Sequence, residues 1–293
     1  MRSVPTTLIL ALTVIPMGGQ LKGQRTNTAV NERLWSDRPA CRSAEGCETK
    51  RRPHQYVAGL KSRQHGPTCE ASPELFALKA HDLPVFAVNG GVLFTAGMTI
   101  DADGAPNAYG PKNRGLDYTA NARNAHGWVA LVTDMKGRPV IQRAGPYRGY
   151  YVSTTSLEHQ NIQNSRDPRK YLDARRIPYI ALPADFARKF GLSLGDLAAV
   201  LNNQNGLLAY AIYGDVGPRG RIGEGSIALA DKLKIPSNPR RDSVPGGVTY
   251  VVFPGSAARL GKSITLSRIN GSGSRLYREW LADGNCATES THR

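Results

Sequence analysis

Two carboxylates flank a short glycine-containing loop in the second half of the sequence. Asp215 follows Tyr210–Tyr213, an apolar segment that predicts a strand, and Glu224 precedes Ser226, which predicts the N-cap of a helix. We expect both carboxylates to face one turn, with small neighbours that leave room for a ligand. Such a pair suits hydrolysis of a glycosidic bond, in which one carboxylic acid protonates the leaving oxygen while a carboxylate activates water or attacks the sugar. A turn aspartate and a helix-start glutamate would give the same pattern, so the pair alone does not decide the chemistry.

A second acidic element stands earlier in the chain, where Asp101 and Asp103 form an Asp-x-Asp-Gly sequence. A calcium loop is excluded, because Ala105 and Pro106 stand where a ligand and a glycine belong and Lys112 where a carboxylate belongs. We therefore predict no metal site. The two aspartates are either solvated acids of a turn, or cleft residues that pair with ammonium groups of a substrate.

Three further residues are candidates for substrate contact. Asp117 is a weaker candidate of the same kind as the Asp-x-Asp pair, and Tyr109 and Tyr213 could stack on sugar rings or belong to the core. The sequence contains no phosphate loop, no dinucleotide fingerprint and no nucleophile elbow, and its six histidines fall in no nucleophile motif. No cofactor is predicted.

The chain between residues 81 and 265 predicts short strands separated by turns. Strands are expected within 85–94, 128–133, 139–142, 149–155, 179–182, 197–201, 207–213 and 248–253, and helices within 183–190 and 226–233. Residues 134–137 predict the turn of a hairpin. This pattern indicates a single mostly β domain, built as a barrel or a sandwich.

The N-terminal residues resemble an export signal, with Arg2 ahead of the apolar run Leu8–Pro16. This run is shorter than the roughly 20 apolar residues that cross a membrane. We assign residues 1–20 to a signal peptide, 21–80 to a poorly patterned leader or linker, and 266–293 to a C-terminal extension. A buried strand or an uncleaved anchor is the alternative for the first segment. The expected location is secreted, either extracellular or periplasmic.

The four cysteines have no C-x-x-C partner, which disfavours a zinc cage. They are Cys41, Cys47, Cys69 and Cys286. In an exported chain we expect them to be oxidised, in one of the three pairings that four cysteines allow.

The net charge of +15 indicates an anionic partner such as nucleic acid, acidic lipid or an acidic polymer. No nucleic-acid-binding motif supports the first of these, so we expect no nucleic-acid partner. We also expect no stable membrane insertion and a monomeric protein. The charge also disagrees with a polycationic substrate. Total charge does not decide this, because the Debye length at physiological salt is about 8 Å and the charge of the cleft itself matters more.

The segment 210–233 resembles the matching stretch of the fungal-type chitosanases, glycoside hydrolase family 75, with a Gly-Asp at a strand end and a Gly-Glu-x-Ser leading into a helix. Similar stretches occur in the same order at 97–104, 177–184 and 248–255, and the stretches 115–118 and 151–155 are similar to bacterial members. The resemblance covers about residues 85–255. It implies a double-psi β-barrel and inverting hydrolysis of β-1,4-linked glucosamine polymers, with Asp215 as the general base and Glu224 as the general acid.

One point of physical chemistry opposes these roles. A carboxylate just ahead of a helix should be stabilised in its ionised form, whereas a general acid needs a raised pKa. Burial or the charge of Asp215 must outweigh the helix if Glu224 is the acid.

Three functions are therefore carried forward. The first is a secreted, endo-acting chitosanase, whose polymer substrate is the expected partner. The second is a hydrolase or lytic enzyme acting on another amino-sugar wall polymer such as peptidoglycan, which the positive charge favours. The third is a non-catalytic, expansin-like polysaccharide-binding module, which the presence of both Asp215 and Glu224 disfavours.

Overall fold

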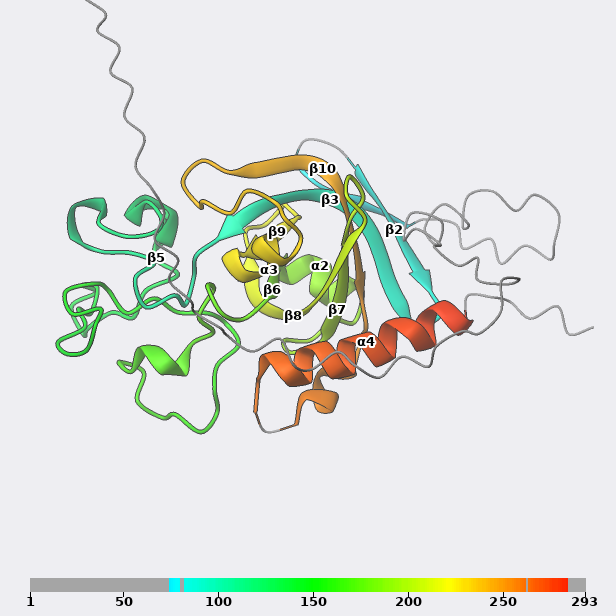
Figure 1. Ribbon diagram of the computed structural model, residues 1–293. Helices are drawn as coiled ribbons and strands as arrows, with labels where there is room; N and C mark the ends of the chain where they lie inside the picture. The colour runs from blue at the N-terminus through cyan, green and yellow to red at the C-terminus, as the bar shows by residue number, and fades with distance from the viewer. Residues whose placement is uncertain (1–73, 80–81, 262, 284–293) are drawn as a thin grey trace, which may run out of the picture. The chain divides into compact units, whose positions relative to one another are not determined.

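The structure is a computed structural model that describes residues 74–79, 82–261 and 263–283 (Figure 1). They belong to one compact unit of the chain, Lys50–Arg293. The predicted signal peptide, most of the predicted leader and all four cysteines lie outside the described residues. The end of the predicted leader forms a strand, β1 (Glu74–Ala77), which pairs with β2 (Asp82–Val88).

Six strands close into a barrel in the order β3, β10, β7, β8, β6 and β9, because β9 pairs back onto β3. Their bounds are β3 (Gly91–Asp101), β6 (Tyr179–Pro183), β7 (Leu197–Asn202), β8 (Leu207–Gly217), β9 (Glu224–Ser226) and β10 (Ser243–Val252). The pairs β6–β8 and β3–β9 are parallel, and the other four are antiparallel. The prediction of a mostly β, single-barrel fold is confirmed.

Local sequence explains several of these elements. The β2–β3 turn consists of Asn89 and Gly90, whose positive φ angles of 50° and 72° are those of a two-residue type I′ hairpin loop. The two predicted helices form as α2 (Ala184–Lys189) and α3 (Ile227–Lys232). The predicted N-cap of α3 is confirmed, because the Oγ of Ser226 accepts a hydrogen bond from the backbone N–H of Leu229.

The barrel wall separates two apolar clusters. The interior is filled by aromatic and aliphatic side chains, with the rings of Phe94 and Tyr250 stacked at 4.9 Å and Phe186 of α2 edge-on to Phe94. Along β6, Ile180 and Leu182 point into this interior, so their neighbours on the strand point outward. The outward face of β6 contributes to the candidate site.

The outer cluster is covered partly by α4 (Leu266–Asp283), which packs against β7 and β8 (Figure 1). Gly273 permits this close packing, since a Cβ there would lie 2.8 Å from the Cβ of Tyr210. The indole N–H of Trp280 donates a 2.8 Å hydrogen bond to the carbonyl of Val88. Residues 266–283, which we predicted to be an extension, are therefore a helix packed on the barrel. Among the described helices, none has the length and apolar character needed to span a membrane.

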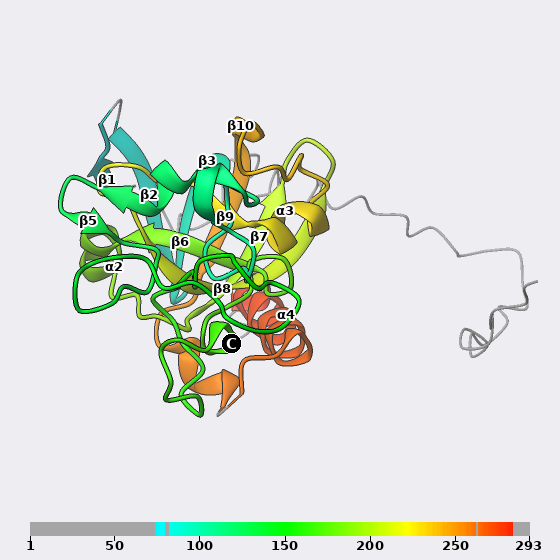
Figure 2. The same cartoon turned by 90° about the vertical axis from the view of Figure 1, so that its left-hand side faces the viewer.

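A long irregular segment, residues 102–178, connects β3 to β6 and lies over the side of the barrel where β6 and β9 are found (Figure 2). It holds short elements: η1 (Pro111–Asn113), η2 (Thr119–Ala122), β4 (Arg123–Asn124), β5 (Gly127–Trp128) and η3 (Pro168–Lys170); η4 (Ser256–Leu260) follows β10. The predicted turn at 134–137 forms, but its flanking strands and the one at 149–155 are reduced to isolated bridges, such as Thr133 with Pro139. Asp134 and Val140 still donate across this bridge to the carbonyls of Arg138 and Val132, so a short hairpin is present without a continuous ladder.

Candidate active site

The strand register places Asp215 and Glu224 on one face of the barrel. In β6, Ala181 pairs with Asp215 of β8 on one side and with Glu224 of β9 on the other. Residues paired across strands point to the same face of a sheet, which here is the outer face. With strands about 4.8 Å apart, the two α-carbons are separated by about 10 Å. The two carboxylates therefore face a common space with one strand between them.

Gly214 determines that Asp215 points outward. Tyr213 pairs with Ile180 and Asp215 with Ala181, so Gly214 is an extra, unpaired residue of β8. Without this bulge Asp215 would align with Leu182 and point into the apolar interior, because a shift of one residue reverses every side chain. Only glycine fits, since a Cβ at this position would lie 2.7 Å from the Cβ of Tyr179. The sequence predicted Asp215 beyond the strand end, whereas β8 continues to Gly217.

The carboxylate of Asp215 is held by three hydrogen bonds to one oxygen. Its Oδ1 accepts from the backbone N–H of Ser156 at 2.9 Å, from the Ser156 hydroxyl at 2.6 Å and from the backbone N–H of Val216 at 2.8 Å. Oδ2 has no hydrogen-bond partner among the described residues. Burial raises the pKa of Asp215, and the bonds from Ser156 and Val216 oppose that shift. The donors therefore favour the ionised form.

Glu224 has the opposite environment. No hydrogen bond to its carboxylate is found within the described part of the chain, and burial, followed by the nearby charge of Asp215, raises its pKa to about 7. Arg221 lowers this pKa, but less. Glu224 is the first residue of the three-residue strand β9 and lies three positions before α3, so it is not a charge within the first turn of that helix. The effect of burial on the pKa of Glu224 is therefore larger than any effect of the α3 dipole.

Asp101 and Asp103 join the same cluster. Asp101 pairs with Ser226, two residues beyond Glu224, which puts its side chain on the outer face. The carboxylate oxygens of Asp101, Asp103 and Asp215 lie within 4.8 Å of one another. Burial and the neighbouring carboxylates raise the pKa of both Asp101 and Asp103 well above its usual range. Among the described residues these three aspartates are the group with oxygens close enough to hold one metal ion, and the same oxygens could bind an ammonium group.

Hydrogen bonds fix the Asp-x-Asp turn. The backbone N–H of Asp103 donates to Oδ1 of Asp101 at 2.7 Å, and the Tyr109 hydroxyl donates to Oδ1 of Asp103 at 2.6 Å. The Tyr179 hydroxyl donates to the carbonyl of Asp103 at 2.9 Å. Tyr109 is buried, so its position is that of a hydrogen-bond donor to the cluster rather than an open stacking surface.

The remaining two predicted residues lie in different places. Asp117 is buried, its carboxylate accepts hydrogen bonds from the side-chain amide of Asn121, and its charge raises the pKa of Glu224 slightly, so it lies near the pair. Tyr213 is in the barrel interior, with its hydroxyl donating to the carbonyl of Leu182 at 3.3 Å. It precedes the bulge and therefore points away from Asp215.

The sequence analysis missed three residues of this site: Ser156, Tyr179 and Arg221. Ser156 directly follows the stretch 151–155 that carried part of the family resemblance, which is the one signal near it. Nothing in a single sequence connects Ser156 to Asp215, because 59 positions separate them.

The pKa of Glu224 gives a test of its surroundings. Arg221→Ala should move the alkaline limb of the pH–activity profile to higher pH, because loss of the guanidinium lets the pKa of Glu224 rise and keeps this carboxyl group protonated to higher pH. The measurement is the pH dependence of kcat/KM. Arg219→Ala is the matched control, since Arg219 lies in the same loop but pairs with Asp185 at 3.3 Å. Equal profiles for wild type and Arg221→Ala would contradict the expectation.

A closed β-barrel that presents one anchored aspartate and one glutamate of raised pKa on the same face offers the two kinds of carboxyl group that glycoside hydrolysis requires. The family described as fungal chitosanase of glycosyl hydrolase group 75 matches residues 98–270, more than half of the 293-residue chain. The chain belongs to this family, and the predicted resemblance is confirmed. A comparison with curated proteins gave no match.

Proposed function

We propose that the protein is an exported, endo-acting chitosanase that hydrolyses β-1,4-linked glucosamine polymers with inversion, using Asp215 as the general base and Glu224 as the general acid. The observation that carries this proposal is the contrast between the two carboxylates on one face of the barrel. Asp215 has three donors on Oδ1, whereas Glu224 has a pKa raised to about 7.

The two environments support these separate roles. A base must be ionised and must present a free oxygen to water, and Asp215 keeps Oδ2 available while its donors stabilise the anion. An acid must be protonated near neutral pH, and burial gives Glu224 that property. The acid would protonate the leaving glycosidic oxygen while the base removes a proton from the attacking water.

The placement of the pair supports inversion. With β6 between the strands that carry them, the two carboxyl groups have room for a water molecule between base and sugar. Inverting pairs are typically about 6.5–9.5 Å apart, against about 5–5.5 Å for retaining pairs. The family membership supports the same stereochemical outcome.

The surrounding acids support a substrate that carries amines. Asp101, Asp103 and Asp117 add three carboxyl groups beside the pair, in a chain whose net charge is +15. An ammonium group placed among these carboxylates would gain charge-assisted hydrogen bonds and would lower their pKa values. A local acidic site thus answers the objection that a basic protein should repel a polycation.

Export is part of the proposal because of the apolar run at 8–16 and the four cysteines. We expect cleavage of the chain near residues 18–24 and oxidised cysteines. Mass spectrometry of the exported protein checks both, and an intact N-terminus with four free thiols would contradict this part.

A second candidate substrate is an anionic amino-sugar wall polymer such as peptidoglycan. The observation that favours it is the basic character of the segment 102–178, where Arg143, Arg148, Arg166 and Arg176 are exposed. These side chains would attract an anionic polymer and repel chitosan. The acidic cluster next to the pair gives the reason for placing chitosan first.

Incubation of the purified protein with chitosan, chitin and peptidoglycan tests the proposal. We expect chitosan to give soluble oligosaccharides of mixed length, as internal cleavage does, and proton NMR of the first product to show the inverted anomer. If products are released from peptidoglycan and not from chitosan, the substrate is peptidoglycan and the proposal of chitosan is wrong. Monomer release from the chain ends or a retained anomer would contradict endo action or inversion, respectively.

A further inference from the structure

Ser156 makes two hydrogen bonds to a single carboxylate oxygen. Both its backbone N–H and its hydroxyl donate to Oδ1 of Asp215, at 2.9 and 2.6 Å. The backbone N–H of Val216 donates to the same oxygen at 2.8 Å and lies 3.2 Å from the Ser156 Oγ. The hydroxyl therefore belongs to a closed set of contacts with one acceptor atom, Oδ1, and none of these donors reaches Oδ2.

The bulge in β8 also brings Ser156 to this position. Because Gly214 is unpaired in the β6–β8 ladder, its carbonyl is free to accept a hydrogen bond from the backbone N–H of Leu157 at 3.0 Å. This bond attaches the chain on one side of Ser156 to the residue just before Asp215. One irregularity thus turns the carboxylate outward and anchors its donor.

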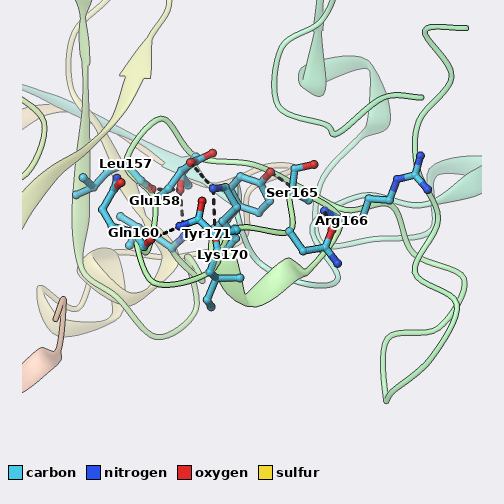
Figure 3. A network of polar contacts seen from close by, with 12 residues as sticks. Leu157, Glu158, Gln160, Ser165, Arg166, Lys170 and Tyr171 are labelled. Carbon is cyan, nitrogen blue, oxygen red and sulfur yellow. Dashed lines mark hydrogen bonds and ion pairs between the residues drawn. The ribbon is translucent and has the colours of Figure 1, made fainter. Parts of the chain in front are cut away.

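Other contacts stabilise the loop formed by residues 157–171, which follows Ser156 (Figure 3). Lys170 forms a 2.8 Å ion pair with Glu158 and donates to the carbonyl of Ile162, and the Tyr171 hydroxyl donates to the carbonyl of Ser165. The Lys170 side chain is 14% exposed and that of Glu158 is 33% exposed, so the ion pair is only partly screened by solvent. None of these contacts reaches Asp215, so loop support and the Ser156 hydroxyl can be separated by substitution.

We propose that Ser156 is a positioning residue for Asp215: its hydroxyl and N–H fix Oδ1, so that Oδ2 is the oxygen that faces the attacking water. The role in water activation rests on the proposed function. The orientation of the carboxylate does not, because it follows from the three donors alone. Ser156 acts through Asp215 and needs no contact with the substrate.

Ser156→Ala tests this assignment by removing one donor while keeping the backbone N–H. We expect kcat on chitosan to fall by about 10- to 100-fold, the size of one hydrogen bond to a charged group, with little change in KM. The acid limb of the pH–kcat profile should move to higher pH, because the ionised form of Asp215 loses a donor. Ser156→Thr keeps the hydroxyl and should restore most of the activity.

The charged and titratable groups that face Asp215 are unchanged in this variant. They are Asp101, Asp103, Glu224 and Tyr179. Tyr171→Phe is the matched control, since it removes a hydroxyl from the same loop without touching Asp215. It should keep the wild-type kcat and pH profile.

Two results would overturn the assignment. One is a Ser156→Ala protein with wild-type kcat and an unmoved acid limb. The other is a Tyr171→Phe protein with the same loss as Ser156→Ala, because the loop as a whole would then be responsible.

A measurement that does not depend on catalysis tests the positioning role of Ser156 separately from the proposed chitosanase activity. Carbon-13 NMR of the aspartate carboxyls, with Asp215 assigned from Asp215→Asn, should show a higher pKa for Asp215 in Ser156→Ala than in wild type. If wild type cleaves no polymer but this shift occurs, the function is wrong and the positioning stands. If chitosan is cleaved but the pKa does not move, the positioning is wrong and the function stands.

Discussion

The Asp215→Asn protein is expected to lose about 10²–10⁴-fold in chitosan hydrolysis, the usual contribution of a general base, while keeping its fold. The three donors on Oδ1 fix the orientation of the asparagine side chain in this variant. Only an acceptor satisfies them, so the amide carbonyl must take the place of Oδ1 and the amide nitrogen the place of Oδ2. A donor then stands where the proton of water has to be accepted.

The measurement is the initial rate of product formation on chitosan, together with the thermal unfolding midpoint of each protein. Asp134→Asn is the matched control: this partly exposed aspartate pairs with Arg138 at 2.8 Å in the 134–137 turn and makes no contact with Asp215, and the variant should keep the wild-type rate. Full activity of Asp215→Asn in a folded protein would remove the whole site assignment. Equal losses in both variants would point to a general effect of the substitution.

The parts of the fold that could be predicted are those determined by residues close together in the sequence. Asn89 and Gly90 specify a hairpin turn by backbone conformation, and Ser226 caps α3 through its own side chain. Many short apolar strands predicted a barrel or a sandwich, and the family resemblance implied the barrel. By contrast, the segments beside the 134–137 turn predicted regular strands, but the structure has isolated bridges there, with two backbone hydrogen bonds flanking the Thr133–Pro139 bridge.

The sequence allowed the acidic residues of the site to be named, but it did not predict how their side chains are arranged. The side on which Asp215 lies depends on one extra residue, Gly214, and a glycine beside an aspartate predicts a turn at a strand end as readily as a bulge within the strand. The same bulge explains why Tyr213, two residues before Asp215, points into the interior. Ser156 could not be found at all, since its role depends on a loop closure between distant parts of the chain.

The Glu224→Gln protein is expected to lose about 10²–10⁴-fold on chitosan, because an amide cannot give a proton to the leaving oxygen. This loss should depend on the leaving group. A glucosamine oligosaccharide with an aryl leaving group of low pKa needs little protonation, so the variant should cleave it at a rate much closer to that of wild type. Asp215→Asn should lose activity on both substrates, since water must be activated in either case.

The pH profile gives a second readout of the same variant. Wild type should show an alkaline limb near the Glu224 pKa of about 7, because activity falls as the acid loses its proton. With the aryl substrate, Glu224→Gln should lack this limb, since glutamine does not titrate. Glu279→Gln is the matched control, as this half-exposed glutamate of α4 pairs with Arg259 of η4 at 3.2 Å. Equal losses on both substrates, or a persisting limb near pH 7, would mean that Glu224 is not the proton donor to the leaving group.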